Sequence, residues 1–152
     1  MAKFILAILI ITFSTLTHAW TYVPKSDPFT DEDLSYVYQF GDDGESFIQA
    51  RCDPEGFNIS VGATTITLPQ NAIKVVWRFD KGEVFYSGEW DGSINRRGAY
   101  VPVDRIKSVL QGLIKGTTLV VRLYDAVGKD HTYSFDLMGF RAAGSKLKCH
   151  MR

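Results

Sequence analysis

Hydrophobic and polar residues alternate along most of the chain, and a period of two is typical of strands with one buried face. Residues 34–40 (LSYVYQF) place Leu34, Tyr36, Tyr38 and Phe40 on one face. Turn sequences rich in Gly, Asp and Pro separate such segments. The expected strands are residues 34–40, 47–52, 57–61, 64–68, 73–80, 83–90, 117–124 and 131–137, with 57–61 and 64–68 forming a hairpin around Gly62 and Ala63.

A helical period appears in the second half of the chain. Six apolar residues recur at helical spacing between Pro102 and Gly116: Val103, Ile106, Val109, Leu110, Leu113 and Ile114. Proline is tolerated in a first turn and glycine commonly ends a helix. A short terminal helix is expected over residues 139–147, with Phe140, Ala143 and Leu147 on one side.

These elements predict a mostly β, α+β fold of about eight strands and two helices. Strands at spacings of roughly 8–15 residues joined by turns favour an antiparallel β-sandwich or half-barrel. The central helix and the C-terminal helix are expected to cover an open end or edge. The length suits a single domain over residues 20–152.

The first nineteen residues have the three parts of a secretory signal peptide. A basic start at Lys3 precedes an apolar run over residues 4–13, and Ala19 offers a small residue for cleavage. The apolar run is too short to cross a hydrocarbon core, which needs about 20 residues. We therefore expect a periplasmic or secreted chain beginning at Trp20, with no stable membrane insertion after cleavage. The alternative is an uncleaved membrane anchor.

Composition and charge exclude two classes of protein. The 13% aromatic content and zero formal charge argue against disorder. With 17 basic and 17 acidic residues, the chain lacks the basic excess of a general nucleic-acid binder. The charge is uneven, because residues 27–55 are strongly acidic and residues 141–152 are basic. The two regions either neutralise each other or form two poles that bind different partners.

Cys52 and Cys149 are the two cysteines of the chain. In an exported protein an even number of cysteines predicts a disulfide. Such a bond would tie the C-terminus to an early strand. The alternative is two separate buried thiols.

The search for catalytic motifs and metal sites yields little. His131 and His150 lack partners at metal-ligand spacing, so neither a metal site nor a cofactor is expected. The acidic residues around one predicted hairpin offer a carboxylate pair for a small envelope hydrolase: Asp80, Glu83, Glu89 and Asp91. Carboxylates that flank a turn are normally solvated, so a non-enzymatic protein is favoured.

Five residues are candidates for binding. Arg78 and Asp80 lie two apart on one strand, and Arg78 is either solvated or pairs with a carboxylate of the next strand for structure or recognition. Arg96 and Arg97 lie in a loop and are either solvated or grip an anionic partner. Trp90 is a candidate anchor, because Tyr, Trp and Arg dominate binding hot spots. Tyr36, Tyr38, Tyr86 and Tyr100 are further anchors or core residues.

The order of these features resembles the TagO/VasI family of small exported proteins found with type VI secretion clusters. The matching pieces are short motifs: Trp20, residues 26–31 (SDPFTD), Arg51-Cys52, residues 57–59 (FNI), residues 76–80 (VWRFD), Trp90, Ser93, residues 135–140 (FDLMGF) and Cys149. Related exported proteins, including some carried by mobile elements, share this outline. The resemblance implies a periplasmic, disulfide-bonded, non-enzymatic accessory domain. Its expected partner is an envelope or secretion-apparatus protein.

Overall fold

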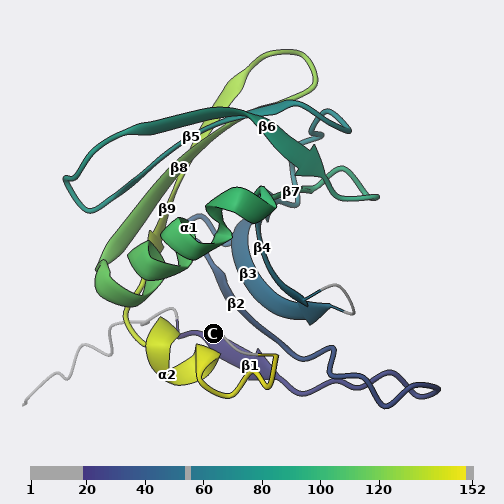
Figure 1. The fold of residues 1–152 in the computed structure, drawn as a ribbon. Coiled ribbons are helices and arrows are strands. Elements are labelled where there is room, and N and C mark those ends of the chain that lie inside the picture. Colours follow the sequence, from purple (N-terminus) through teal and green to yellow (C-terminus); the bar gives the residue numbers. More distant parts are fainter. Residues whose placement is uncertain (1–18, 54–55, 150–152) are drawn as a thin grey trace, which may run out of the picture.

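The computed structural model describes residues 19–53 and 56–149. These residues form a nine-stranded sheet, antiparallel throughout, in the order β1-β2-β3-β4-β7-β6-β5-β8-β9 (Figure 1). The expectation of a mostly β fold with a central and a C-terminal helix is confirmed. The elements are β1 (Thr21–Val23), β2 (Tyr36–Phe40), β3 (Ser46–Asp53), β4 (Gly56–Ala63), β5 (Ile73–Phe79), β6 (Phe85–Gly92), β7 (Gly98–Tyr100), α1 (Val103–Lys115), β8 (Thr118–Tyr124), β9 (Asp130–Asp136) and α2 (Phe140–Gly144).

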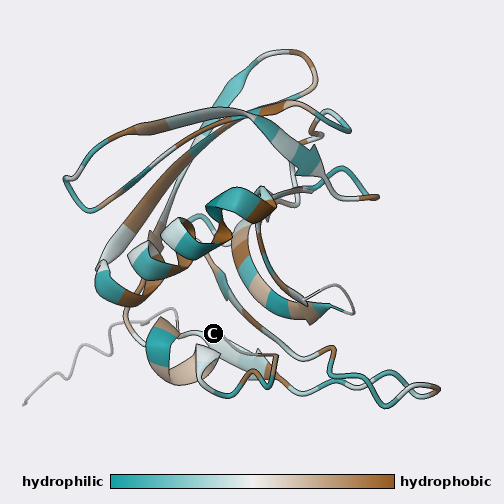
Figure 2. Cartoon of the chain, in the orientation of Figure 1, coloured by the Kyte–Doolittle hydropathy of each residue, from teal (hydrophilic) through white to brown (hydrophobic). Residues whose placement is uncertain are grey.

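Side chains alternate between a buried and a more exposed face along the sheet. On β3, Ile48 and Ala50 are fully buried, whereas Gln49 and Arg51 lie on the outer face. The ribbon of β3 and β4 accordingly shows bands of opposite hydropathy in Figure 2. This alternation is the period-two pattern of the sequence. On β4, by contrast, residues 59–63 are all buried, so this strand is covered on both faces.

Helix α1 lies between two parts of the sheet, one formed by β1 to β4 and the other by β5, β6, β8 and β9 (Figure 1). The parts are joined through β7, which pairs with β4 on one side and with β6 on the other. The helix buries Val109 and Leu113, which continue the helical period of the sequence. Gly112 permits the close approach of Phe79, since a Cβ at Gly112 would lie 2.2 Å from the ring of Phe79.

The predicted strand at residues 64–68 is wrong, and so is the hairpin at Gly62 and Ala63. Both residues continue β4, and the chain turns at Thr64 instead. Gly62 is paired on both sides, with Phe47 and with Gly98. Ile66 and Leu68 are buried without belonging to a ladder. Hydrophobic and polar residues alternate at 64–68 because this segment is a loop that covers the core and buries Ile66 and Leu68.

The hydrophobic pattern of the sequence did not predict two short strands. The terminal helix is also shorter than expected. The entry segment contains β1, and β7 spans three residues before Pro102. Helix α2 ends at Gly144, yet Phe140, Ala143 and Leu147 are buried as predicted. Trp20 packs on Phe140 with ring centroids 4.7 Å apart.

Residues 1–18 of the expected signal peptide lie outside the described residues. Within the part of the chain that the structure describes, no helix is long and apolar enough to span a membrane.

Candidate functional site

The outer surface of β5, β6 and β8 combines positive charge with apolar side chains. We call this surface the basic face and define it by Lys74, Val76, Arg78, Tyr86, Val120 and Arg122. The strand register assembles it, because Val76 lies between Tyr86 of β6 and Arg122 of β8. Arg78 lies opposite Val120 on the same face. A patch of aliphatic and aromatic side chains is therefore flanked by cations.

Arg78 and Arg122 are diagonal neighbours across β5 and β8. Such positions are roughly 7–8 Å apart, so the two like charges repel each other. Arg122 donates from Nε to Thr132 Oγ1 at 3.0 Å and lies 3.5 Å from Asp130 Oδ2. Within the described residues, Arg78 makes no hydrogen bond and no ion pair. The carboxylate partner expected on the next strand is therefore absent from the described chain, and Arg78 is an exposed cation.

Two shallow hollows lie on the basic face. Their volumes are about 370 and 450 Å³, and both are lined by Val76 and Tyr86. The first also contains Arg78, Val120 and Arg122. Tyr86 is 76% exposed, so its ring is open to contact beside these hollows. The hollows suit an anionic partner that also carries an apolar side chain.

A second face is formed by the aromatic residues of β2. The ring centroids of Tyr36 and Tyr38 are 6.0 Å apart, and those of Tyr38 and Phe40 are 5.6 Å apart. Beside them Arg51 lies over the ring of Tyr100 at 5.9 Å and pairs with Asp53 at 2.5 Å. The hydrogen bond to Asp53 raises the pKa of Arg51. The cation of this face is thus already neutralised, unlike Arg78.

Asp80 does not belong to the same surface as Arg78. It lies in the turn after β5, where its Oδ1 accepts hydrogen bonds from Thr117 and Thr118. The hydroxyl and backbone N–H of Thr117 hold the pKa of Asp80 below its ordinary value of 3.8. Asp80 was expected on the same strand face as Arg78 as a binding candidate; instead it lies in the turn and joins the end of β5 to the start of β8.

Trp90 belongs to the core and not to a binding surface. It is 1% exposed, and its ring centroid lies 5.5 Å from that of Trp77. Its indole N–H finds no hydrogen-bond partner among the described residues. The expectation that Trp90 anchors a partner is corrected by this burial, since a hot-spot residue must be reachable by the partner.

The two arginines of the loop between β6 and β7 differ in role. Arg96 has a φ of 57° and donates from Nε to the carbonyl of Leu68 at 2.8 Å. It therefore fastens the loop that covers the core. Arg97 is exposed, and its backbone N–H is held by the side chain of Asn95. Both side chains are exposed, and within the described residues Arg97 makes no side-chain hydrogen bond like that of Arg96.

The four carboxylates proposed for a hydrolase are spread along the β5–β6 hairpin. Asp80 and Glu83 lie around its turn, and Glu89 and Asp91 lie on either side of the buried Trp90. Glu83 precedes β6 and Asp91 lies near its end, so about eight extended residues separate them by roughly 25 Å.

His131 Nε2 lies 2.9 Å from Asp125 Oδ2, and this contact is the largest cause that lowers the pKa of Asp125. Asp125 also accepts backbone hydrogen bonds in the β8–β9 turn, so this pair stabilises a hairpin.

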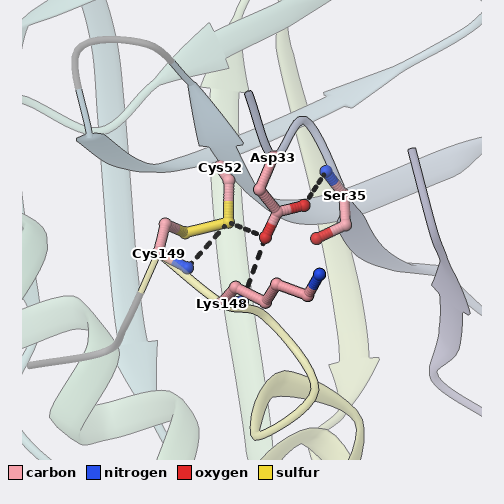
Figure 3. The surroundings of a disulfide bond; sticks show 5 residues. All are labelled: Asp33, Ser35, Cys52, Lys148 and Cys149. Carbon is pink, nitrogen blue, oxygen red and sulfur yellow. Dashed lines mark hydrogen bonds between the residues drawn. A yellow bond between two sulfur atoms is a disulfide. The ribbon is translucent and has the colours of Figure 1, made fainter. Parts of the chain in front are cut away.

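The predicted disulfide between Cys52 and Cys149 is present. The carboxylate of Asp33 points at it, with Oδ2 lying 3.6 Å from Cys52 Sγ (Figure 3). The backbone N–H of Lys148 donates to the same oxygen at 3.1 Å. Partial burial raises the pKa of Asp33, but hydrogen bonds from Ser35 and Lys148 outweigh it and lower that pKa. The acidic segment and the basic tail thus meet at the disulfide.

Sequence reasoning missed Arg122, Val76 and Val120 as parts of a site. Each was assigned to a strand, but the face that they form depends on the register between β5 and β8. The available signal was the alternation along β5. Lys74, Val76 and Arg78 lie on the face opposite the buried Val75 and Trp77.

Comparisons with known proteins give one likeness. No model of a known protein family matches the chain, and no curated protein is similar in sequence. Among solved structures, the chain is similar to invasion associated protein B from Bartonella henselae, with a TM-score of 0.55 and 12% sequence identity. The similarity covers 84% of this chain and 92% of that chain. It shows a shared fold and no more.

Proposed function

We propose that the protein is an exported, non-enzymatic binding module that holds an acidic segment of an envelope protein on its basic face. The observation that carries the proposal is Arg78, an exposed cation with no partner in the described residues, beside a hollow lined by Val120 and Tyr86. A carboxylate placed beside Arg78 would form charge-assisted hydrogen bonds with it, and Arg122, which already contacts Asp130, would lie next to that carboxylate.

Export is supported by the disulfide. Such bonds persist in oxidising compartments such as the periplasm and are rare in the cytosol. Cys52 is almost fully buried and bonded to Cys149, as expected of a structural disulfide. The type VI secretion context belongs to the TagO/VasI resemblance and stays a prediction.

The half-barrel shape is part of the same proposal. The β2–β3 turn lies close to β9, since a Cβ at Gly41 would lie 3.2 Å from the carbonyl of Ser134. This approach supports a sheet that curls towards closure at one end. Curling would keep the core face inside and leave the basic face on the outer surface.

A capture experiment tests the binding role. The mature protein is immobilised and exposed to an envelope extract of the producing organism, and the captured proteins are identified by mass spectrometry. We expect the double variant Arg78→Glu with Arg122→Glu to lose a protein that the wild type captures. The matched control is Lys107→Glu with Arg141→Glu, which reverses two exposed cations elsewhere and should retain it.

Crosslinking then locates the contact. A photoreactive residue at position 120, on the basic face, should crosslink to a segment of the captured protein that contains carboxylates. Equal capture by both double variants, or crosslinks to a segment without acidic residues, would show that the basic face is not the binding surface.

A further inference from the structure

The segment between β1 and β2 presents a phenylalanine to solvent. Phe29 is 94% exposed, although burying an aromatic side chain of this size removes roughly 150–250 Å² from water. The segment is held in one conformation by hydrogen bonds from Asp27 N–H to Glu32 O and from Asp31 N–H to Asp27 O. A bridge between Ser26 and Asp33 closes it. We call residues 26–33 the Phe29 loop.

The Phe29 loop is negatively charged. It contains Asp27, Asp31, Glu32 and Asp33 and no basic residue. The backbone N–H groups of Phe29 and Thr30 donate to Asp27 and lower its pKa, so that this carboxylate is ionised at neutral pH. The loop thus combines one exposed apolar ring with several carboxylates on an ordered backbone. An ordered loop loses little conformational entropy when it binds.

The basic face has the complementary chemistry. Its first hollow is lined by Val84, Tyr86 and Val120, and it is flanked by Arg78 and Arg122. A hollow of about 370 Å³ has room for a phenyl ring among these side chains. Carboxylates on either side of the ring would then face the two arginines, where complementary charge favours encounter and fixes orientation.

The loop and the basic face of one molecule lie far from each other in the fold. The loop precedes β2, at the opposite end of that strand from the β2–β3 turn, which is the part that lies close to β9. In Figure 1 the purple segment before β2 projects away from β5 and β8. A contact between them therefore requires two molecules.

We propose that the Phe29 loop of one copy docks in the Arg78–Arg122 hollow of a second copy. The inference rests on the proposed function of the basic face and names this chain as one of its ligands. The contact joins two different surfaces and so is head-to-tail, which allows chains of more than two copies. A contact made by one short loop is small, so the association is weak and sensitive to salt.

Sedimentation velocity on the mature protein tests the inference. We expect the sedimentation coefficient to rise with concentration between about 10 µM and about 1 mM. The rise should be present in about 50 mM salt and largely lost in about 0.5 M salt, where charges are screened over a few ångströms. Phe29→Ala should weaken the association about tenfold or more. Met138→Ala removes another exposed apolar side chain and should leave it unchanged.

A mixing experiment separates the two surfaces. Phe29→Ala lacks the ring but keeps the basic face, and Arg78→Glu with Arg122→Glu lacks the face but keeps the loop. Each variant alone should associate much more weakly than the wild type, whereas an equal mixture should form a 1:1 dimer that grows no further. This result follows only from a head-to-tail contact between these two surfaces.

The outcomes distinguish this inference from the proposed function. A wild-type protein that stays monomeric at the highest concentration in low salt, or a mixture that forms no dimer, overturns the self-docking. If the arginine variant still loses its envelope partner in that case, the proposed function stands. If self-association is found but the arginine variant captures envelope proteins normally, the basic face serves assembly and the proposed function fails.

Discussion

Asp80 and Thr117 clamp the end of β5 to the start of β8. Oδ1 of Asp80 accepts the hydroxyl of Thr117 at 2.5 Å and its backbone N–H at 3.0 Å. The same oxygen accepts the N–H of Thr118 at 2.9 Å. Asp80 has a φ of 51°, a left-handed conformation that Asp and Asn tolerate better than most residues. The clamp holds in register the two strands that assemble the basic face.

Replacing Asp80 should weaken the fold in a graded way. Asp80→Ala loses all three hydrogen bonds and places alanine at positive φ, so we expect a lower urea midpoint of unfolding than in the wild type. Asp80→Asn keeps a carbonyl acceptor and tolerates the backbone, so its midpoint should lie between the two. Equal midpoints for Asp80→Ala and the wild type would show that the clamp adds nothing to stability.

Acid should destabilise the protein partly through the same group. Hydrogen bonds from Thr117 hold the folded-state pKa of Asp80 below 3.8, and a backbone hydrogen bond from Phe29 does the same for Asp27. A depressed pKa contributes stability above the unfolded-state value, and this contribution is lost as pH falls through the folded-state value. The urea midpoint should therefore fall below about pH 4. Asp80→Asn should show a shallower fall, and an identical pH profile would contradict the linkage.

Removing the disulfide should cost a large part of the stability. Cys52 and Cys149 are 97 residues apart, and closing such a loop stabilises the folded state by about 4–5 kcal/mol in the chain-entropy model. We expect Cys52→Ser with Cys149→Ser to unfold at a much lower urea concentration. The wild type treated with a reductant should behave like this variant. A variant as stable as the oxidised protein would show that packing alone holds the C-terminal segment.

The sequence allowed the strands with strict alternation to be predicted, because burial of one face imposes a period of two. Residues 47–52 are the clearest case, with Ile48 and Ala50 inside and Gln49 outside. Residues 64–68 show the limit of this argument. Ile66 and Leu68 alternate because they cover the core, and an alternating pattern does not say whether a ladder partner exists.

The candidate site was harder to predict because it depends on contacts between strands. Arg78 was singled out from its place on one strand, but its neighbour Arg122 is set by the β5–β8 register. Trp90 was assigned to a surface on residue type alone, whereas its burial depends on packing against Trp77. The chemistry of a side chain follows from its residue type, but the residues that lie beside it on a face depend on how the strands of the sheet pair.

Gly62 leaves less room for a side chain than the other glycines of β4 and β7, and its substitution tests the contact between these two strands. A Cβ at this position would lie 2.0 Å from the carbonyl oxygen of Arg97, and the backbone there is held by its hydrogen bond to Ala63. Gly62→Ala should therefore push β4 from β7 and destabilise the protein by about 1–3 kcal/mol, as overpacking does elsewhere.

Gly88→Ala on β6 is the matched control for Gly62→Ala. A Cβ at Gly88 meets nothing within 4 Å, and its backbone does not have positive φ. Because alanine also loses less entropy on folding than glycine, this variant should be neutral or slightly more stable. Urea unfolding of both variants compares them directly. A Gly62→Ala variant that unfolds at the same urea concentration as Gly88→Ala would show that β4 and β7 do not approach each other as closely as the pairing of Gly62 with Gly98 requires.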